Sequence, residues 1–293
     1  MGKCKNSFLR CNIMSILDLV GNTPMVELWD NVYLKLEMKN PSGSVKDRAA
    51  KAILENANLP FGSRIVEATS GNFGISLALA SAVMGYSLTV VMPEGASVER
   101  ERIIRHYCGR VVRVKGGMTE AVKRAREISE SNSCFMPNQF SNELNALSHY
   151  ETTAPEILCD VGRVDIFVSG VGSGGSITGV GRYLKEKNPG TCVVAVHPSG
   201  GSLIEGIGAG FVPPIFDQSL VDENIFVSLD EAIQNSRILA GKYGIMAGIS
   251  SGAAVFVAKI LSERPENEGK TIVTLLPDGG DRYYSTPLFS FET

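Results

Sequence analysis

Short apolar runs rich in valine and isoleucine alternate with longer amphipathic segments along most of this chain. RIVEA at 64–68, LTVVMP at 88–93 and RVVRV at 110–114 are each followed by a segment with helical periodicity. Strands buried on both faces give such continuous apolar runs, and the intervening helices return the chain so that the strands lie parallel. The alternation therefore predicts an α/β protein, with largely parallel sheets flanked by helices.

A second set with the same pattern follows a polar loop at 138–145. Its elements are expected as strands at 166–170, 192–197 and 271–277 and helices at 229–243 and 252–264. Two sets imply two lobes with a crevice between them, and open α/β sheets bind ligands at the carboxyl ends of their strands. We assign the chain to a smaller mobile lobe at 41–147, a larger lobe at 14–40 and 148–293, and an N-terminal extension at 1–13.

The composition argues against several classes of protein. The net charge is −3 and the basic residues are scattered, so no nucleic acid or membrane surface is expected as a partner. No apolar run reaches the roughly 20 residues that span a bilayer. The six cysteines form no CxxC pair, which argues against a metal site and a disulfide framework. The start lacks the apolar core of a secretory signal. We therefore expect a cytoplasmic protein without a metal ion.

The segment NPSGSVKDRAA at 40–50 places a lysine at an unusual position. Its first residues form a turn, and a helix is expected from Val45, so Lys46 lies near a helix N-terminus. A cation opposes the helix dipole there, which favours the neutral amine that can condense with an aldehyde. The alternative is a solvated surface lysine beside an Asp47–Arg48 pair.

Two loops offer groups that bind carboxylates. EATSGNFG at 67–74 lies between a strand and a helix, where hydroxyls, an amide and main-chain N–H groups form a carboxylate-binding nest. The alternative is a capped helix start. MPNQFSN at 136–142 carries Gln139, which can reach a substrate carboxylate or simply face solvent.

A glycine-rich segment, SGVGSGGSITGVG at 169–181, follows a predicted strand. Glycines let the main chain approach an anion, and Ser173, Ser176 and Thr178 add hydroxyls, so a phosphate is the expected ligand. The segment also matches GxGxxG, but the next strand ends in HPS at 197–199, without the acid that binds a ribose. A phosphate ester therefore fits better than NAD. Further on, Asp278 follows a strand in LPDGGDRYYST, where the alternative is a simple turn.

In order along residues 16–286, GNTP, NPSGSVKDR, TSGN, NQF, GSGGS, EGIGAGF, GISSGAA and DRY resemble the motifs of one family. It is the cysteine synthase (O-acetylserine sulfhydrylase) and cystathionine β-synthase family of fold-type-II enzymes, which use pyridoxal 5′-phosphate (PLP). The resemblance implies a two-lobed fold like that of the tryptophan synthase β subunit, with the PLP phosphate in the larger lobe.

The resemblance also implies roles for the residues singled out above. Lys46 would hold PLP covalently and move the α-proton of the substrate, and Asn72 would contact the pyridine 3′-oxygen. Asp278 would lie near the pyridine nitrogen or point away from it. The phosphate cup would consist of Gly172, Ser173, Gly174, Gly175 and Ser176. The substrate carboxylate would be held by Thr69, Ser70, Gly71, Asn72 and Gln139.

The function implied is β-replacement, in which O-acetyl-L-serine and sulfide give L-cysteine and acetate. One alternative is a cystathionine β-synthase-like enzyme, which accepts serine itself as substrate or a thiol in place of sulfide. Relatives of that kind also have an aspartate after proline at the position of Asp278. Others are a serine/threonine dehydratase and, last, a non-catalytic binding protein. Phe73 replaces a usual threonine and is expected to reshape the pocket. By analogy, we expect a homodimer whose cleft can accept the C-terminal tail of serine acetyltransferase.

Overall fold

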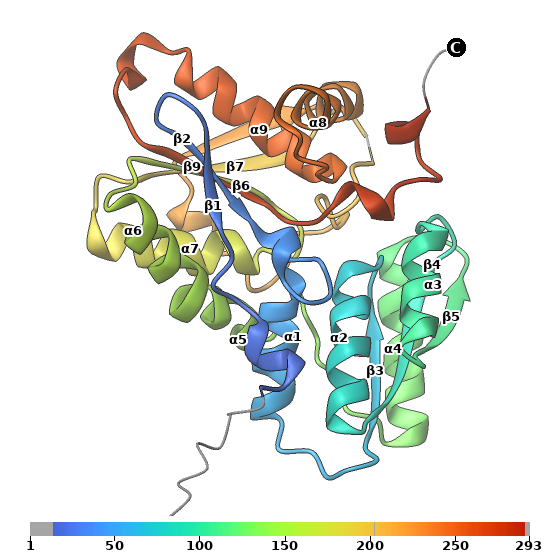
Figure 1. Cartoon of the computed structure of the whole chain (residues 1–293). Helices are drawn as coiled ribbons and strands as arrows, with labels where there is room; N and C mark the ends of the chain where they lie inside the picture. Colours follow the sequence, from blue (N-terminus) through green and yellow to red (C-terminus); the bar gives the residue numbers. More distant parts are fainter. Residues whose placement is uncertain (1–13, 202, 291–293) are drawn as a thin grey trace, which may run out of the picture.

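Two separate sheets organise the chain (Figure 1). The computed structural model describes residues 14–201 and 203–290, so the extension predicted at 1–13 lies outside the described residues. One sheet has six strands in the order β1-β2-β9-β6-β7-β8, and the other has three in the order β3-β4-β5. This arrangement confirms the predicted α/β class.

The six-stranded sheet is parallel except for its first pair, in which β1 runs antiparallel to β2. Its strands are β1 Met25–Trp29, β2 Val32–Leu36, β6 Ile166–Gly170, β7 Cys192–Pro198, β8 Glu223–Val227 and β9 Ile272–Leu276. Alternate residues of β7 face opposite layers, as the two-residue period of a strand requires. Val194 and Val196 pack against α8 (Leu229–Tyr243) and α9 (Ile249–Ser262).

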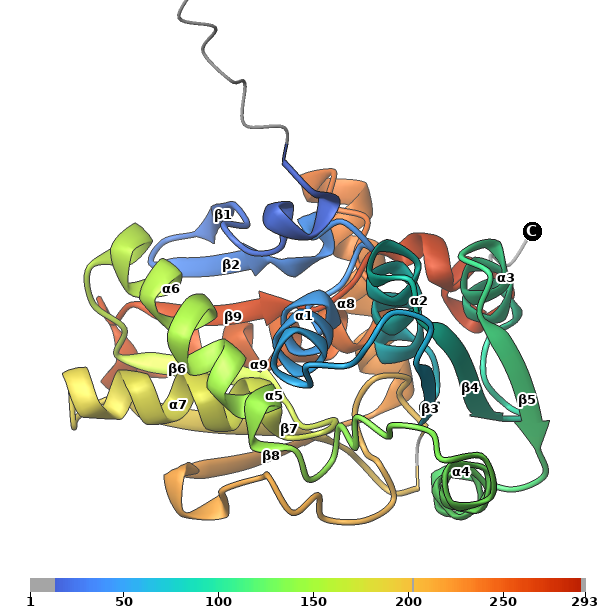
Figure 2. The same ribbon diagram turned by 90° about the horizontal axis from the view of Figure 1, so that it is seen from below.

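The other face of this sheet carries a second apolar layer. Val193 and Ala195 of β7 pack there with α6 (Ala154–Val161) and α7 (Gly175–Lys187). Figure 2 shows the six-stranded sheet between these helix pairs. Because both faces are covered, the strands are apolar on both sides, which is why they appear in the sequence as continuous runs.

The three-stranded sheet consists of β3 (Arg64–Ala68), β4 (Ser87–Pro93) and β5 (Arg110–Val114), all parallel. Its helices are α1 Lys46–Asn56, α2 Asn72–Met84, α3 Val98–His106 and α4 Met118–Asn132. The first three share a core with Ile65 and Val90, whereas α4 packs on the opposite face against Val66 and Val91. The predicted lobe limits at 41–147 remain an interpretation.

Some elements were absent from the prediction. They are β8, α5 (Glu143–Ser148), a π-helix at His149–Thr153, and α6. Helix α9 also begins at Ile249, three residues before its expected start. Short 3-10 turns lie at Ile16–Leu19, Glu37–Lys39, Gln218–Leu220, Pro265–Asn267, Gly280–Arg282 and Pro287–Phe289. Within the described ranges, no helix is long and apolar enough to cross a membrane.

Candidate active site

Lys46 is the first residue of α1, and the turn before it is fixed from two sides. The Val45 N–H donates to the Pro277 carbonyl at 2.8 Å, which ties the helix start to the end of β9. The Asp47 carboxylate accepts the Ser42 N–H at 2.6 Å, closing the turn. Lys46 therefore has a defined position where β9 ends, near a helix N-terminus as predicted.

The amine of Lys46 lies 3.1 Å from the hydroxyl of Ser173, to which it donates a hydrogen bond. Burial lowers the pKa of this lysine to about 8 from its ordinary 10.5, because desolvation penalises the ammonium form. A substantial fraction of the amine is thus neutral at mildly alkaline pH. The alternative of an ordinary solvated lysine does not describe this side chain.

The predicted phosphate cup is the turn that joins β6 to α7. Gly174 is the N-cap of α7 and has a φ of +88°, a conformation that favours glycine. A Cβ at Gly172 would lie 2.2 Å from the Gly206 carbonyl oxygen, and one at Gly175 would lie 2.2 Å from Asn145 Oδ1. The first N–H groups of a helix lack intrahelical partners and carry partial positive charge, which suits a phosphate.

A chain of hydrogen bonds runs from Lys46 to the other loops. Asn145 Nδ2 donates to Ser173 Oγ at 3.0 Å and to the Gln139 carbonyl at 2.8 Å. Gln139 Nε2 then donates to the Ala68 carbonyl at 3.1 Å, at the end of β3. The structure thereby brings Lys46, Ser173 and Gln139 together. Gln139 is buried, which contradicts the solvent-facing alternative.

The TSGN loop joins β3 to α2. The buried Thr69 hydroxyl accepts the Gly71 N–H at 3.1 Å, and Gly71 has a φ of +151°. Ser70 is partly exposed, and Asn72 begins α2. Phe73, expected to reshape the pocket, is instead buried in the core of the three-stranded sheet, because α2 turns that side chain inward.

Asp278 lies fully buried at the end of β9, and its Oδ2 atom is crowded with donors. Asn72 Nδ2 donates to this oxygen at 2.6 Å and the Tyr283 hydroxyl at 2.8 Å. Burial, followed by the charge of Asp278, raises the pKa of Tyr283, which keeps that hydroxyl a donor. The other oxygen, Oδ1, is buried without a hydrogen-bond partner. This environment excludes a simple exposed turn.

Two arginines without a predicted role lie around the TSGN loop. Arg282 belongs to the DRY motif, whereas Arg100 belongs to none of the motifs. Arg100 from α3 is buried, ion-pairs with Glu205, and lies 3.6 Å from Asp278. Arg282 donates to Asn72 Oδ1 at 2.8 Å and also to the Ser42 carbonyl. The one sequence signal for Arg100 is its helical spacing from Ile104, which places a charge on the buried face of α3.

A buried histidine was also missed, beside the glycine turn. His149 Nε2 lies 3.2 Å from the hydroxyl of Ser176, and Nδ1 lies 2.9 Å from Thr153 Oγ1. Its pKa is well below the ordinary value, because burial and then the charges of Arg48 and Lys46 disfavour imidazolium. His149 is therefore neutral, and the side chain of Ser176 is directed toward it.

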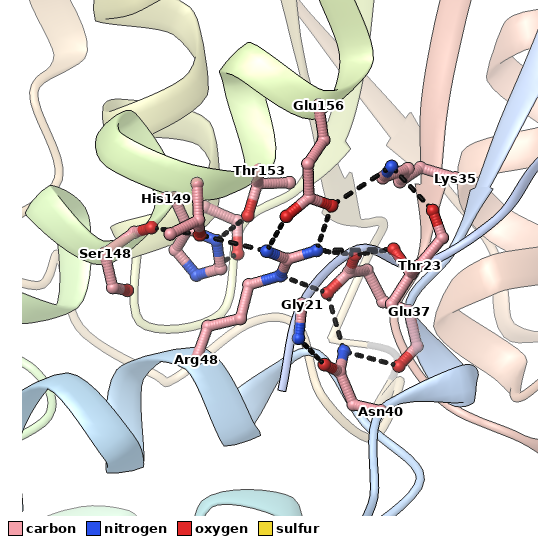
Figure 3. Close-up of polar contacts among 12 residues, drawn as sticks. Gly21, Thr23, Lys35, Glu37, Asn40, Arg48, Ser148, His149, Thr153 and Glu156 are labelled. Atoms are coloured by element: carbon pink, nitrogen blue, oxygen red, sulfur yellow. Dashed lines mark hydrogen bonds and ion pairs between the residues drawn. The ribbon is translucent and has the colours of Figure 1, made fainter. Parts of the chain in front are cut away.

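Below the site, an ion-pair network attaches α1 to α6, as Figure 3 shows. Arg48 makes bidentate contacts of 2.7 Å with Glu37 and, through its other edge, with Glu156. Lys35 reaches Glu156 at 3.1 Å and the Thr23 carbonyl at 2.7 Å. Since Lys46 is two residues before Arg48, this network also positions the lysine.

Comparison with known proteins identifies the chain's family. A family model described as pyridoxal-phosphate dependent enzyme matches residues 16–278. The chain belongs to this family. The cysteine synthase of Staphylococcus aureus is 42% identical in an alignment that covers 95% of this chain and 97% of that protein.

Solved structures of the family agree with the fold. O-ureido-L-serine synthase superposes with a TM-score of 0.90 at 42% identity, covering 94% of each chain. The cysteine synthase (OASS) of Entamoeba histolytica has a TM-score of 0.90 at 38% identity, covering 100% of this chain and 95% of that one. The predicted PLP-dependent, fold-type-II class is thus confirmed.

The residues of this chain fit the cofactor that its family uses. A partly desolvated amine suits its aldehyde, and a glycine turn at a helix N-terminus suits its phosphate. The unpartnered Oδ1 atoms of Asp278 and Asn145 leave acceptors within the site. Within the described part of the chain, no group of three or more His, Cys, Asp or Glu side chains could hold a metal ion.

Proposed function

We propose that this PLP-dependent enzyme is a cysteine synthase, which converts O-acetyl-L-serine and sulfide to L-cysteine and acetate. The observation that carries the proposal is the contact between Lys46 Nζ and Ser173 Oγ, because it supports a role for this amine beside the proposed phosphate cup. The substrate class follows from full-length similarity to proteins named cysteine synthase.

Bound PLP supplies an electron sink that stabilises negative charge at the substrate α-carbon. In the proposed mechanism, Lys46 removes the α-proton and returns it after the acetoxy group has been replaced by sulfide. Its pKa of about 8 suits both directions of proton transfer near neutral pH. The phosphate is assigned to the turn formed by Gly172, Ser173, Gly174, Gly175 and Ser176.

The substrate carboxylate is assigned to the TSGN loop and to Gln139. These groups are joined through the hydrogen bond from Gln139 to the Ala68 carbonyl, directly before Thr69. Asn72 is assigned to contact the 3′-oxygen on the pyridine ring of PLP. Asp278 is assigned to the part of the site that holds the cofactor, because it accepts a hydrogen bond from Asn72. Buried donors held this way lose little entropy when the substrate binds.

The visible spectrum of the purified protein, followed through successive additions, tests the proposal. We expect absorption of bound PLP, a spectral change with O-acetyl-L-serine, recovery with sulfide, and release of L-cysteine. Lys46→Ala should abolish turnover, whereas Lys51→Ala should retain it, because Lys51 pairs with Glu55 on the outer side of the same helix. Turnover by Lys46→Ala would reject the assignment.

Plain serine, tested in parallel, addresses the second candidate. The buried Asp278 after Pro277 favours a cystathionine β-synthase-like enzyme as the alternative, and the same spectral change with serine would support it. Homodimer formation, a cytoplasmic location, docking of a serine acetyltransferase tail and the lobe limits at 41–147 are further parts of the proposal, supported by the resemblance alone.

A further inference from the structure

Glu67 is the fourth residue of β3 and lies two residues before Thr69, where the TSGN loop starts. Its side chain is 1% exposed, although the carboxylate has a large cost of burial. Oε2 accepts the main-chain N–H of Asn138 at 2.6 Å. Glu67 therefore bridges two segments that are 71 residues apart in the chain.

No cation compensates this carboxylate among the described residues, because no ion pair includes it. Burial raises the pKa of Glu67 to about 8, an effect that hydrogen bonds from the N–H groups of Asn138, Gln139 and Ala68 partly oppose. An apolar side chain would avoid this cost, since the neighbouring strand residues Val66 and Ala68 are fully buried. Unfavourable burial of this kind is typical of functional sites.

The main-chain N–H that Glu67 binds belongs to Asn138, which directly precedes a residue of the proposed substrate site. Asn138 has a φ of +56°, a left-handed conformation that asparagine adopts more readily than most residues, and its main-chain N–H donates to Glu67. The next residue is Gln139, whose side chain donates to the Ala68 carbonyl. Glu67 and Gln139 thus form two adjacent links between the same pair of loops.

We propose that Glu67 is a positioning residue for the substrate carboxylate. It holds the 136–142 loop against the end of β3, so that Gln139 and the TSGN loop present their donors together. This inference rests on the proposed function, which assigns the carboxylate to these two loops.

Glu67→Gln tests the inference, because it preserves size but replaces one acceptor oxygen of the carboxyl group with an NH2 group. The main-chain N–H groups that donate to this carboxyl then lose an acceptor. We expect KM for O-acetyl-L-serine to rise about tenfold, equivalent to one lost hydrogen bond to a buried acceptor. KM for sulfide and the visible spectrum of bound PLP should stay unchanged. The preference for O-acetyl-L-serine over its α-methyl ester should also fall about tenfold, because only the acid presents a carboxylate.

Glu120→Gln is the matched control. Glu120 also accepts a main-chain N–H, that of Gly117 at 2.7 Å, but it is exposed at the start of α4. Glu120→Gln should leave KM for both substrates and the acid-to-ester preference unchanged. If Glu67→Gln does not fold, Glu67→Asp retains both acceptor oxygens at a shorter reach and should show the same changes to a smaller degree.

Unchanged acid-to-ester preference in a folded Glu67 variant would overturn the positioning role while leaving the proposed function intact. This includes the case in which turnover of the acid and of the ester falls equally, since equal losses indicate general damage to the enzyme. If the unmodified enzyme did not turn over O-acetyl-L-serine and sulfide, both the proposed function and this inference would be rejected.

Discussion

Asn72 donates a hydrogen bond of 2.6 Å to Asp278, although the two residues are 206 positions apart. One begins α2 beside the three-stranded sheet and the other follows β9 of the six-stranded sheet. Arg100 and Arg282 lie around the same contact, so charge and hydrogen bonding are concentrated where the two sheets meet. Buried polar contacts therefore join the ends of α2 and β9 at this junction.

Asp278→Asn should destabilise the protein by about 3 kcal/mol, because it removes a buried charge that faces Arg100. Urea unfolding measures the change. Tyr283→Phe is the comparison, since it removes only one hydrogen bond to the same carboxylate and should cost about 1 kcal/mol. Equal losses in the two variants would contradict a role for the charge.

The rate at which PLP is incorporated into cofactor-free protein should rise with pH and reach half its maximum near pH 8. The neutral amine is the nucleophile, and burial lowers the Lys46 pKa to about 8, so deprotonation occurs well below the ordinary 10.5. Growth of visible absorption over a pH series gives the midpoint. A rate that increased only toward pH 10 would show that Lys46 titrates normally.

Gly175→Ala should disrupt the glycine turn, because the added Cβ would lie 2.2 Å from Asn145 Oδ1. We expect at least tenfold weaker retention of PLP, about 1.4 kcal/mol, measured by dialysis and absorbance. Gly181→Ala lies in the same helix and meets Val193 at 3.4 Å, close to ordinary contact. That variant should retain PLP, and a similar loss in both would place the cause in the helix as a whole.

Glu156→Gln should weaken the attachment of α1 by about 2 kcal/mol in urea unfolding, because Arg48 loses one of its two carboxylate partners. Glu127→Gln is the control, since its pair with Arg124 is exposed and contributes little. A loss as large from Glu127→Gln would show that the effect is not specific to the buried network.

The pKa of Glu156 also determines how the stability of the protein changes at acidic pH. Burial alone would raise the pKa of Glu156, but hydrogen bonds from Arg48 outweigh it and lower the pKa to about 2. The folded pKa lies below the ordinary 4.5, so the stabilisation is complete above about pH 4.5 and is lost as pH falls toward 2. Glu156→Gln should reduce the dependence of unfolding free energy on pH in this range. An unchanged slope would assign acid sensitivity to other groups.

Local sequence determined the secondary structure of most of the chain and located the loops that carry the site. Valine-rich runs predicted β3 to β7 and β9, because burial on both faces leaves a continuous apolar signal. This apolar signal did not reveal β8, whose residues alternate between partly buried and more exposed positions at the sheet edge. It also did not reveal α5, which is only six residues long. Turn chemistry alone predicted a helix start at Val45, which is the N-cap of the observed helix from Lys46.

Only the tertiary structure decided which polar groups meet. Glu67 and Asn145 acquire their roles from main-chain and hydroxyl partners in other segments, and Arg100 from carboxylates contributed by distant loops. A periodic pattern reports whether a position is buried, since burial depends on the face of a helix or strand. It cannot report the partner of a buried charge, because that partner is brought near only when the two sheets pack together.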